Sequence, residues 1–405
     1  MDVGNIKQMR AQVWEEYLEA VRNDAQRKKE VKEQQMTFGD AVMKYGIKFM
    51  GEPDENGYPL YIALHGGGQG ETPEMNDHQW EIMGIYYARG MKHGIYVNPR
   101  GVRDTWDTHA NPESYPLYDR LIQNMIAFYG ADPNRVYICG FSAGGDGVYL
   151  VGPPMADRFA AVSMSAGHHN YNSILNLYNT PIRLQVGMND DAYGRNRVTV
   201  EYMNHLDDLS KEYGGGYIHD GYVHKDKGHN FRDWSFEEQE VLADPNKWLA
   251  DGSTESKMVN ANVIDFLKQF TRNPLPSKVV WDLDKRPEER AVDSFYWVRV
   301  PKKVAKGMPT DNPAIHVPSK ESKRMIVVHI EKEENRIVVE KNTTGKAFEV
   351  LFNEEMLDVT KPIEVVGVDG AVKVVEPEIS LEVLKETTYE RGDYNYQFVG
   401  KVYIA

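Results

Sequence analysis

Short apolar runs alternate with amphipathic segments through the middle of the chain. Alternation of this kind predicts strands joined by helices, which together build a parallel sheet with helices on both faces. Because the runs are apolar almost without a break, their strands are expected to be buried on both faces. The predicted strands lie at 60–64, 94–97, 135–139, 160–164, 182–186 and 217–223, and helices are predicted at 118–128, 196–213 and 259–270.

The two ends of the chain have different patterns. Residues 5–34 predict one charged helix whose second half, including Arg27 and Glu30, is expected to be solvated. Beyond Asn273-Pro274-Leu275-Pro276 the pattern changes to β-rich runs separated by turn residues. We therefore expect an α/β domain at 1–272 and a smaller all-β, sandwich-like domain at 279–405. The predicted strands of the second domain lie at 295–300, 325–330, 336–340, 347–352, 363–368, 372–375 and 394–403.

The sequence Gly140-Phe141-Ser142-Ala143-Gly144 directly follows the apolar run at 135–139. A serine between small residues at a sharp strand-to-helix turn is typical of a nucleophile elbow, in which the serine hydroxyl projects from the sheet. The residues after Gly144 are suitable for starting a helix, which supplies the second half of that context. The pattern therefore predicts that Ser142 is a catalytic nucleophile.

A second glycine-rich segment, His65-Gly66-Gly67-Gly68, ends the strand predicted at 60–64. Acyl transfer passes through a tetrahedral oxyanion, which needs backbone N–H groups fixed in advance. Glycines let those N–H groups face the charge without interfering side chains. We expect the donors of an oxyanion hole to be Ala143 and either Gly67 or Gly68, with His65 in a structural role. The alternative interpretation is a tight turn at the end of a strand.

Two further loops follow predicted strands and carry an acid and a base. Asp190 and Asp191 follow the strand at 182–186, and His229 follows the strand at 217–223. The order serine, acid, histidine is the order of the catalytic triad in α/β-hydrolases. In such a triad the imidazole takes the serine proton and the carboxylate orients the imidazole.

These motifs resemble those of a known group of enzymes. Residues 55–272 are similar to the esterase and depolymerase branch of the α/β-hydrolases, which includes polyhydroxybutyrate-depolymerase-like and feruloyl-esterase-like proteins, and also resemble the catalytic domains of prolyl-oligopeptidase-type peptidases. The stretches GFSAGGDGVY, QVGMNDDAYGRN, DKGH and FTRNPLPSKVVW are similar to hydrolases with a β-rich C-terminal extension. The resemblance implies an α/β-hydrolase fold, and it favours Asp190 over Asp191 as the acid.

Residues near the predicted site have two interpretations. The loop at 98–106 should reach the same rim of the sheet, so Arg103 and Trp106 are expected to line a substrate pocket. Arg100, Arg103 and Asp104 could equally form an internal cluster of ion pairs. Arg195, which follows the acid loop, has the same two interpretations.

Composition narrows the partners that can be expected. The net charge of −14 argues against nucleic acid or an anionic membrane, because both bind basic surfaces. One cysteine, Cys139, and the absence of any signal-like segment lead us to expect a cytoplasmic protein. The spacing of histidines and cysteines shows no metal-binding pattern, and no cofactor is expected. Assembly into a homo-oligomer is left open.

The expected activity is hydrolysis of a small or oligomeric carboxylic ester through an acyl-enzyme. The alternatives are a peptidase that uses the same residues and a non-catalytic binding protein on a hydrolase frame. None of the catalytic motifs lies in the C-terminal part, so we expect that part to shape or cover the site, or to set assembly. Phe295, Tyr296 and Trp297 are predicted to share a strand there, with one face packed on the catalytic domain.

Overall fold

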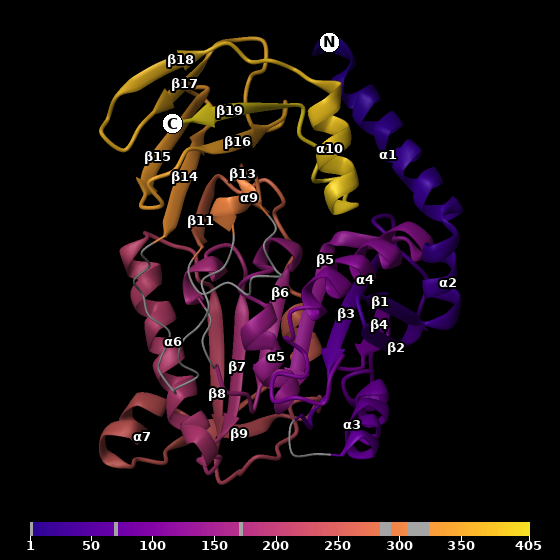
Figure 1. The fold of residues 1–405 in the computed structure, drawn as a ribbon. Helices are drawn as coiled ribbons and strands as arrows, with labels where there is room; N and C mark the ends of the chain where they lie inside the picture. The colour runs from indigo at the N-terminus through magenta and orange to yellow at the C-terminus, as the bar shows by residue number, and fades with distance from the viewer. Residues whose placement is uncertain (1–2, 69–71, 170–172, 284–292, 306–323) are drawn as a thin grey trace.

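A ten-stranded sheet forms the centre of the molecule (Figure 1). The structure is a computed structural model and describes residues 3–68, 72–169, 173–283, 293–305 and 324–405. The strand order is β1-β2-β4-β3-β5-β6-β7-β8-β9-β10, and the six strands from β4 to β8 in this order are parallel. These six are the six runs predicted from the sequence. They are β3 (Tyr58–Leu64), β4 (Gly94–Pro99), β5 (Ala131–Phe141), β6 (Ala161–Ser165), β7 (Ile182–Gly187) and β8 (His219–His224).

Helices cover both faces of this sheet, which confirms the predicted layers. Successive side chains of a strand point to opposite faces, and β3 shows this clearly. Leu60 and Ile62 belong to the apolar cluster that also contains residues of α4, α5 and α6, whereas Tyr61 and Ala63 pack with residues of α3 and α8. The flanking helices are α3 (Pro73–Tyr86), α4 (Ser114–Tyr129), α5 (Ala143–Val151), α6 (Arg195–Glu212) and α8 (Val263–Leu267).

Four antiparallel edge strands were not predicted. β1 (Gln35–Phe38) and β2 (Ala41–Met50) form a hairpin at one edge, and β9 (Gln239–Leu242) and β10 (Ser256–Val259) extend the other. Edge strands bury only part of their side chains, so they lack the continuous apolar runs of the central strands. The helix predicted at 259–270 is corrected accordingly, because Val259 ends β10 and α8 begins only at Val263.

The single N-terminal helix is a second correction. The chain forms α1 (Ile6–Asn23) and α2 (Ala25–Glu33), separated at Asp24, whose extended backbone lets its side chain cap α2 by accepting from the Arg27 N–H. The expectation that Arg27 and Glu30 are solvated is also wrong, since both are buried. Arg27 donates to Gln123, and Glu30 accepts from Asn124. Both partners lie on α4, so α2 packs against the sheet domain.

The C-terminal part has two sheets, but it is not all-β as expected. Helix α10 (Leu381–Arg391) lies within it, and α9 (Lys302–Ala305) adds one short turn. The strand predicted at 394–403 is much shorter. One sheet has the order β11-β14-β15-β17-β18, with β11 (Lys278–Asp282), β14 (Met325–Glu331), β15 (Arg336–Asn342), β17 (Ile363–Val366) and β18 (Val372–Val375). The other has the order β12-β13-β16-β19, with β12 (Ser294–Phe295), β13 (Val298–Arg299), β16 (Phe348–Phe352) and β19 (Gly400–Ile404).

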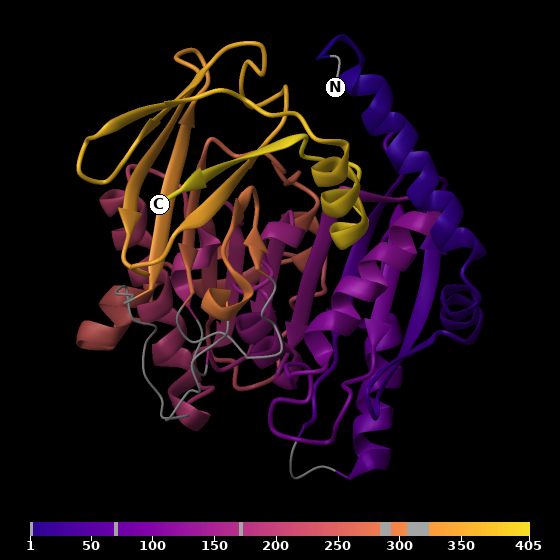
Figure 2. The same ribbon diagram turned by 45° about the horizontal axis from the view of Figure 1, so that its top comes forward.

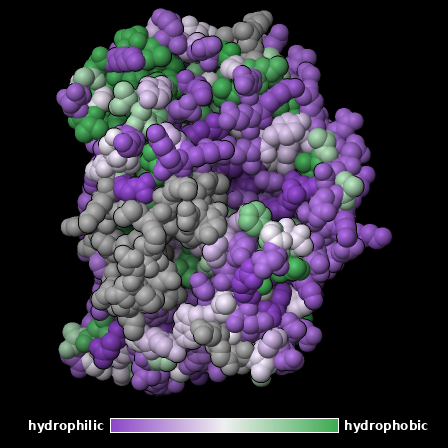
Figure 3. Space-filling model, viewed as in Figure 1, coloured by the Kyte–Doolittle hydropathy of each residue, from purple (hydrophilic) through white to green (hydrophobic). Residues whose placement is uncertain are grey.

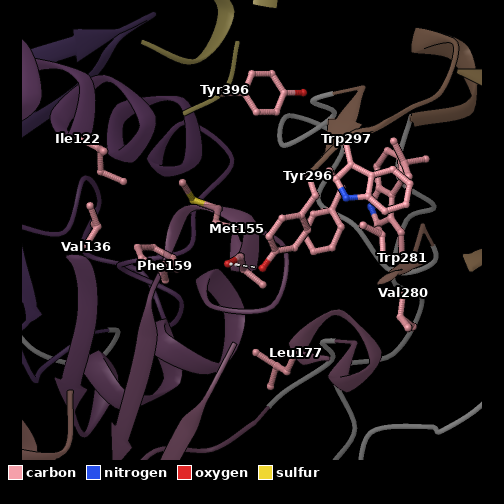
Figure 4. Close-up of a cluster of buried hydrophobic side chains, with 14 of the residues drawn as sticks. Ile122, Val136, Met155, Phe159, Leu177, Val280, Trp281, Tyr296, Trp297 and Tyr396 are labelled. Atoms are coloured by element: carbon pink, nitrogen blue, oxygen red, sulfur yellow. Dashed lines mark hydrogen bonds between the residues drawn. The ribbon is translucent and has the colours of Figure 1, made fainter. Parts of the chain in front are cut away.

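Phe295, Tyr296 and Trp297 do not lie on one strand. Phe295 ends β12, and Tyr296 and Trp297 form the two-residue turn to β13. Tyr296 has a φ of 50°, and all three side chains are buried. Figure 4 shows Tyr296 directed towards the α/β part, near Met155 and Phe159. Its backbone N–H donates to Asp157 Oδ2 over 3.3 Å. The expected packing on the α/β part is therefore present, but a turn makes it.

The two parts of the chain share one core. A single apolar cluster contains Met155 and Phe159 from the first part together with Trp281 and Trp297 from the second. The N-terminal helix joins them as well, because α1 lies beside α10 (Figure 2) and Trp14 contacts Tyr394 with ring centroids 5.5 Å apart. The N-terminal helix α1 and the C-terminal part therefore pack against each other.

Buried ion pairs cross the same junction. Arg272 donates to Asp393 over 2.5 Å, and Arg391 pairs with Asp157. Arg158 donates to the backbone oxygen of Arg391 over 3.0 Å. The side chains of these residues are almost fully buried. Removing one partner of a buried pair costs about 3–5 kcal/mol, because the remaining charge is left without a counter-charge.

Expressing residues 1–276 alone is therefore expected to yield a protein that does not unfold cooperatively. The truncation would expose the shared core and leave Arg272 and Asp157 without their partners, a loss comparable to the whole stability of about 5–15 kcal/mol of a typical domain. Circular dichroism during thermal unfolding measures this. A cooperative transition like that of the full chain would contradict the expectation.

Most of the face seen in Figure 3 is hydrophilic, but apolar side chains gather over the β17–β18 hairpin. Val368, Val372 and Val374 there are each about 60% exposed. β18 ends its sheet in the described part of the chain, so this hairpin combines an apolar face with a free edge. Among the described helices, none is both long and apolar enough to cross a membrane.

Candidate active site

Ser142 lies at the turn between β5 and α5. Its backbone is strained, with φ 60° and ψ −121°, a combination that is unfavourable for a side chain bearing a Cβ. The neighbouring glycines permit the turn, since a Cβ on Gly140 would lie 2.2 Å from the Gly144 oxygen and one on Gly144 would lie 2.0 Å from the Leu64 oxygen. The Ser142 N–H donates to the backbone oxygen of Ser165 over 3.0 Å. These contacts hold the hydroxyl at the end of the sheet.

Two loops bring an imidazole and a carboxylate to this hydroxyl. Ser142 Oγ lies 2.8 Å from His229 Nε2, and His229 Nδ1 lies 2.8 Å from Asp190 Oδ2. Asp190 follows β7 and is buried, whereas its neighbour Asp191 is exposed. A carboxylate accepts only, so Nδ1–H donates to Asp190 and Nε2 is left to accept from the serine hydroxyl.

Close backbone contact joins the acid loop to the histidine loop. A Cβ on Gly187 would lie 1.9 Å from the Gly228 oxygen, so only glycine fits where the loops meet. The Asn189 N–H donates to the Lys227 oxygen over 2.7 Å. The hydrogen bond between Asp190 and His229 is therefore supported by the backbones on both sides of it.

Arg195 completes the surroundings of the acid. It donates to Asp190 Oδ1 over 2.8 Å, on the carboxylate oxygen that His229 does not use, and it lies 3.5 Å from His229 Nδ1. Burial by itself would raise the pKa of Asp190, but the hydrogen bond from His229 and the charge of Arg195 outweigh it and keep that pKa below its ordinary value. The carboxylate is thus ionised at neutral pH, as an acceptor for an imidazole must be.

Strand order and loop positions together identify the architecture. A mostly parallel sheet carries the serine on a strained turn after β5, the carboxylate after β7 and the imidazole after β8, in the chain order serine, acid, histidine. The chain has the α/β-hydrolase fold.

The glycine loop that was predicted to hold the oxyanion is held in this α/β-hydrolase fold by Asn76, on α3. Asn76 Oδ1 accepts from the Gly68 N–H over 2.8 Å, and its amide nitrogen donates to Asp104 over 2.7 Å. Gly68 is therefore already engaged. The N–H groups of Gly67 and Ala143 make no hydrogen bond to another described residue. Of the two glycines predicted as donors, Gly67 is thus the one with an N–H available for a substrate oxygen.

His65 is structural in this geometry. Its Nδ1 donates to the Gly66 oxygen over 2.6 Å, and its Nε2 accepts from the Gly101 N–H over 3.0 Å. Burial lowers the pKa of His65 to about 4, so the ring stays neutral and keeps one donor and one acceptor. It ties the glycine loop to the loop that follows β4.

Replacing Asn76 by alanine is expected to lower kcat for nitrophenyl acetate about 10- to 100-fold, because the glycine loop loses the side chain that orients it and buried polar groups lose a partner worth about 1–3 kcal/mol. The melting temperature should fall as well. Met75→Ala, one position earlier on the exposed side of α3, is the control. An equal loss of kcat in Met75→Ala would assign the effect to the helix and not to the amide.

A pocket of about 440 Å³ opens beside Ser142. Its wall comes largely from one face of α3, where Gln79, Ile82, Met83 and Tyr86 recur at helical spacing. These residues were not predicted from the sequence. Their spacing, in a helix that begins just after the glycine loop, is the signal that could have found them. The full lining is Gly66, Gly67, Gln79, Ile82, Met83, Tyr86, Phe141, Ser142, His229 and Asn230.

None of the three residues predicted for a substrate pocket lines the pocket beside Ser142. Arg103 instead donates to Asp40 and Glu113, as in the alternative interpretation of ion pairs. Arg195 donates to Asp190. Trp106 is 44% exposed and packs edge-on against Tyr193, with ring centroids 5.4 Å apart. A role for Trp106 in substrate binding stays a prediction. No group of three or more metal-ligating side chains occurs in the described part of the chain.

Parts of the chain are similar to known proteins. No family model matches it. A stretch of 151 residues, 37% of the chain, is 28% identical to the bifunctional acetylxylan esterase/xylanase XynS20E of Neocallimastix patriciarum, and this match spans only 22% of that protein's length.

Solved structures similar to the chain include two esterases and a depolymerase. A thermostable esterase has a TM-score of 0.40 at 18% identity, over 59% of this chain and 62% of its own. The poly(3-hydroxybutyrate) depolymerase LpqC of Bordetella parapertussis has a TM-score of 0.37 at 15% identity, over 57% and 88%. The acetyl xylan esterase of Aspergillus awamori has a TM-score of 0.33 at 14% identity, over 49% and 94%. With TM-scores below 0.5, the fold assignment rests on the chain's own strand order and serine turn.

Proposed function

We propose that the protein hydrolyses carboxylic esters through an acyl-enzyme, with Ser142 as nucleophile, His229 as base and Asp190 as the acid that orients it. The observation that carries this proposal is the unbroken hydrogen-bonded series Ser142–His229–Asp190 beside a pocket of about 440 Å³. Geometry of this kind activates a serine hydroxyl, since the proton has an acceptor within 2.8 Å.

In the first half of the reaction, Ser142 Oγ attacks the acyl carbon while its proton moves to His229 Nε2. The oxyanion that forms accepts from the N–H groups of Gly67 and Ala143, each donor of this kind being worth about 3 kcal/mol of barrier. The imidazolium is stabilised by Asp190. Collapse of the tetrahedral intermediate breaks the ester bond, and His229 returns the proton to the departing alcohol.

In the second half, His229 takes a proton from water, and the hydroxide attacks the acyl-serine carbonyl. The same two N–H groups hold the oxyanion, and the carboxylic acid leaves as Ser142 regains its proton. The acyl group is proposed to occupy the pocket beside Ser142, whose walls of Ile82, Met83, Tyr86 and Phe141 favour an apolar chain.

The ion pairs of two arginines favour an ester over a peptide as the substrate. Arg103 and Arg195 could each anchor a peptide terminus, but both already pair with carboxylates. A substrate carboxylate would have to displace those partners, at the cost of leaving them unpaired.

The proposal is tested by turnover and labelling of the full chain. The substrates are nitrophenyl esters of graded acyl length, acetylated and feruloylated sugars, and aminoacyl amides, and the label is a fluorophosphonate. We expect ester turnover, with the label found on the peptide that contains Ser142. A folded sample that neither labels nor hydrolyses any ester would overturn the proposal, and a preference for the amides would reassign the protein as a peptidase.

A further inference from the structure

A buried carboxylate, Asp233, lies four residues after His229 on the same loop. Its side chain is fully buried and accepts from the hydroxyl of Tyr86 over 3.0 Å and from that of Tyr87 over 2.7 Å. Its backbone oxygen accepts from the Val263 N–H over 2.9 Å. Through these bonds Asp233 fastens the histidine loop to the end of α3 on one side and to the start of α8 on the other.

Asp233 is an acceptor at the pH of an ordinary assay. Burial raises its pKa to about 6, against the opposing effect of the hydroxyls of Ser165, Tyr87 and Tyr86. Above that value the group is mainly a carboxylate. A tyrosine hydroxyl that donates to a carboxylate is held more tightly than one that donates to a neutral oxygen.

The two tyrosines have different surroundings although they share this carboxylate. Tyr86 lines the pocket beside Ser142, whereas Tyr87 is buried behind it in the apolar cluster on the α3 side of the sheet. Their rings lie edge to face, with centroids 4.8 Å apart. Only one of the two hydroxyl bonds therefore holds a part of the pocket wall.

Ring contacts continue from that wall to the imidazole. The Tyr86 and Phe141 centroids are 5.8 Å apart, and the Phe141 and His229 centroids are 5.7 Å apart. Asp233 is thus linked to both ends of this short series of rings. It accepts a hydrogen bond from Tyr86, and it lies on the same loop as His229, four residues further along the chain.

We propose that Asp233 is a positioning residue that holds Tyr86 against Phe141 and so sets the fit of the acyl group next to His229. The inference rests on the proposed function, since it assigns a determinant of acyl selectivity to that site. When the bond to Asp233 is lost, the Tyr86 ring is free to leave the wall. An extended acyl chain then loses contacts that an acetyl group does not make.

The experiment compares Tyr86→Phe with Tyr87→Phe, which remove one hydroxyl each from the same carboxylate, and adds Asp233→Asn. kcat and KM are measured for nitrophenyl octanoate and nitrophenyl acetate at about pH 8, above the pKa of Asp233. We expect Tyr86→Phe and Asp233→Asn to lower the octanoate-to-acetate ratio of kcat/KM about tenfold, mainly through KM. Contacts of two methylene groups account for a change of that size. Tyr87→Phe should leave the ratio within about twofold while its melting temperature falls comparably, because its hydroxyl bond is lost outside the pocket.

An equal change of the ratio in Tyr87→Phe, or an unchanged ratio in Tyr86→Phe, would overturn the inference. Tyr86→Phe carries the test even where Asp233→Asn does not fold, since it removes a single hydroxyl. Labelling of Ser142 by a fluorophosphonate is measured in every sample. Labelling that persists with an unchanged ratio rejects the role of Asp233 alone, whereas absence of labelling and turnover in the unmodified protein rejects the proposed function as well.

Discussion

Replacing Ser142 by alanine is expected to lower the turnover of a nitrophenyl ester about 10⁶-fold, the scale on which serine hydrolases lose kcat when the nucleophile is removed. The substitution deletes Ser142 Oγ, which lies 2.8 Å from His229 Nε2, and leaves the rest of the site in place. Labelling by a fluorophosphonate should disappear with the activity. Retained labelling of Ser142→Ala would place the nucleophile elsewhere.

Stability provides the control for this substitution. Alanine keeps the Cβ that makes φ 60° and ψ −121° unfavourable, so the melting temperature of Ser142→Ala should stay within about 2 °C of the unmodified protein. Ser142→Gly should also be inactive, but it should melt a few degrees higher. Relief of about 1–3 kcal/mol of strain exceeds the entropic cost of about 0.5–1 kcal/mol that glycine brings. A lower melting temperature for the glycine variant would contradict the strained turn.

Replacing Asp190 by asparagine is expected to lower kcat about 10⁴-fold, whereas the same change at Asp191 should leave kcat within a few-fold of its original value. An amide at position 190 can donate to His229 Nδ1, which favours the tautomer that carries its proton on Nε2. That nitrogen can then no longer accept from Ser142. The amide also removes the charge that stabilises the imidazolium and that pairs with Arg195 over 2.8 Å.

Asp191→Asn is a matched control for Asp190→Asn, because both changes are isosteric and each removes one charge. Asp190 is buried between His229 and Arg195, and Asp191 is exposed. Measuring kcat and KM for one activated ester, together with the melting temperatures, separates catalysis from folding. The opposite ranking of the two variants would transfer the role to Asp191.

Much of the α/β-hydrolase fold could be predicted because its signals are local. The central strands β3, β4, β6 and β7 are buried along almost their whole length, so each leaves a nearly continuous apolar run in the sequence. The residues around Ser142 are equally local, since the glycines that permit the turn lie two positions before and after it. The antiparallel strands β1 and β2 at one side of the sheet were missed, since strands whose side chains alternate between buried and exposed carry no such run.

Asp24 and Arg27 illustrate the opposite case. Helical spacing predicted one helix through both residues, and it could not show that the Asp24 side chain caps a second helix. Nor could it show that the charge of Arg27 is buried against Gln123, almost a hundred residues away. The burial of a charged residue depends on the partner that the fold brings to it, and periodicity contains no information about that partner.

By itself, the sequence determined which residue types stand at the ends of which strands, and with them the place of Ser142 and the order of serine, acid and histidine. Only the tertiary structure decided that Gly67 and not Gly68 has its N–H available, since Asn76 takes the other. The tertiary structure also turned Arg103 towards Asp40 and Glu113 and placed Tyr86 on the pocket wall. The physical reason is the same each time. A turn or a strand is specified by neighbours in the chain, whereas a hydrogen-bond donor, an ion pair or a pocket wall is specified by side chains that meet only when the layers pack.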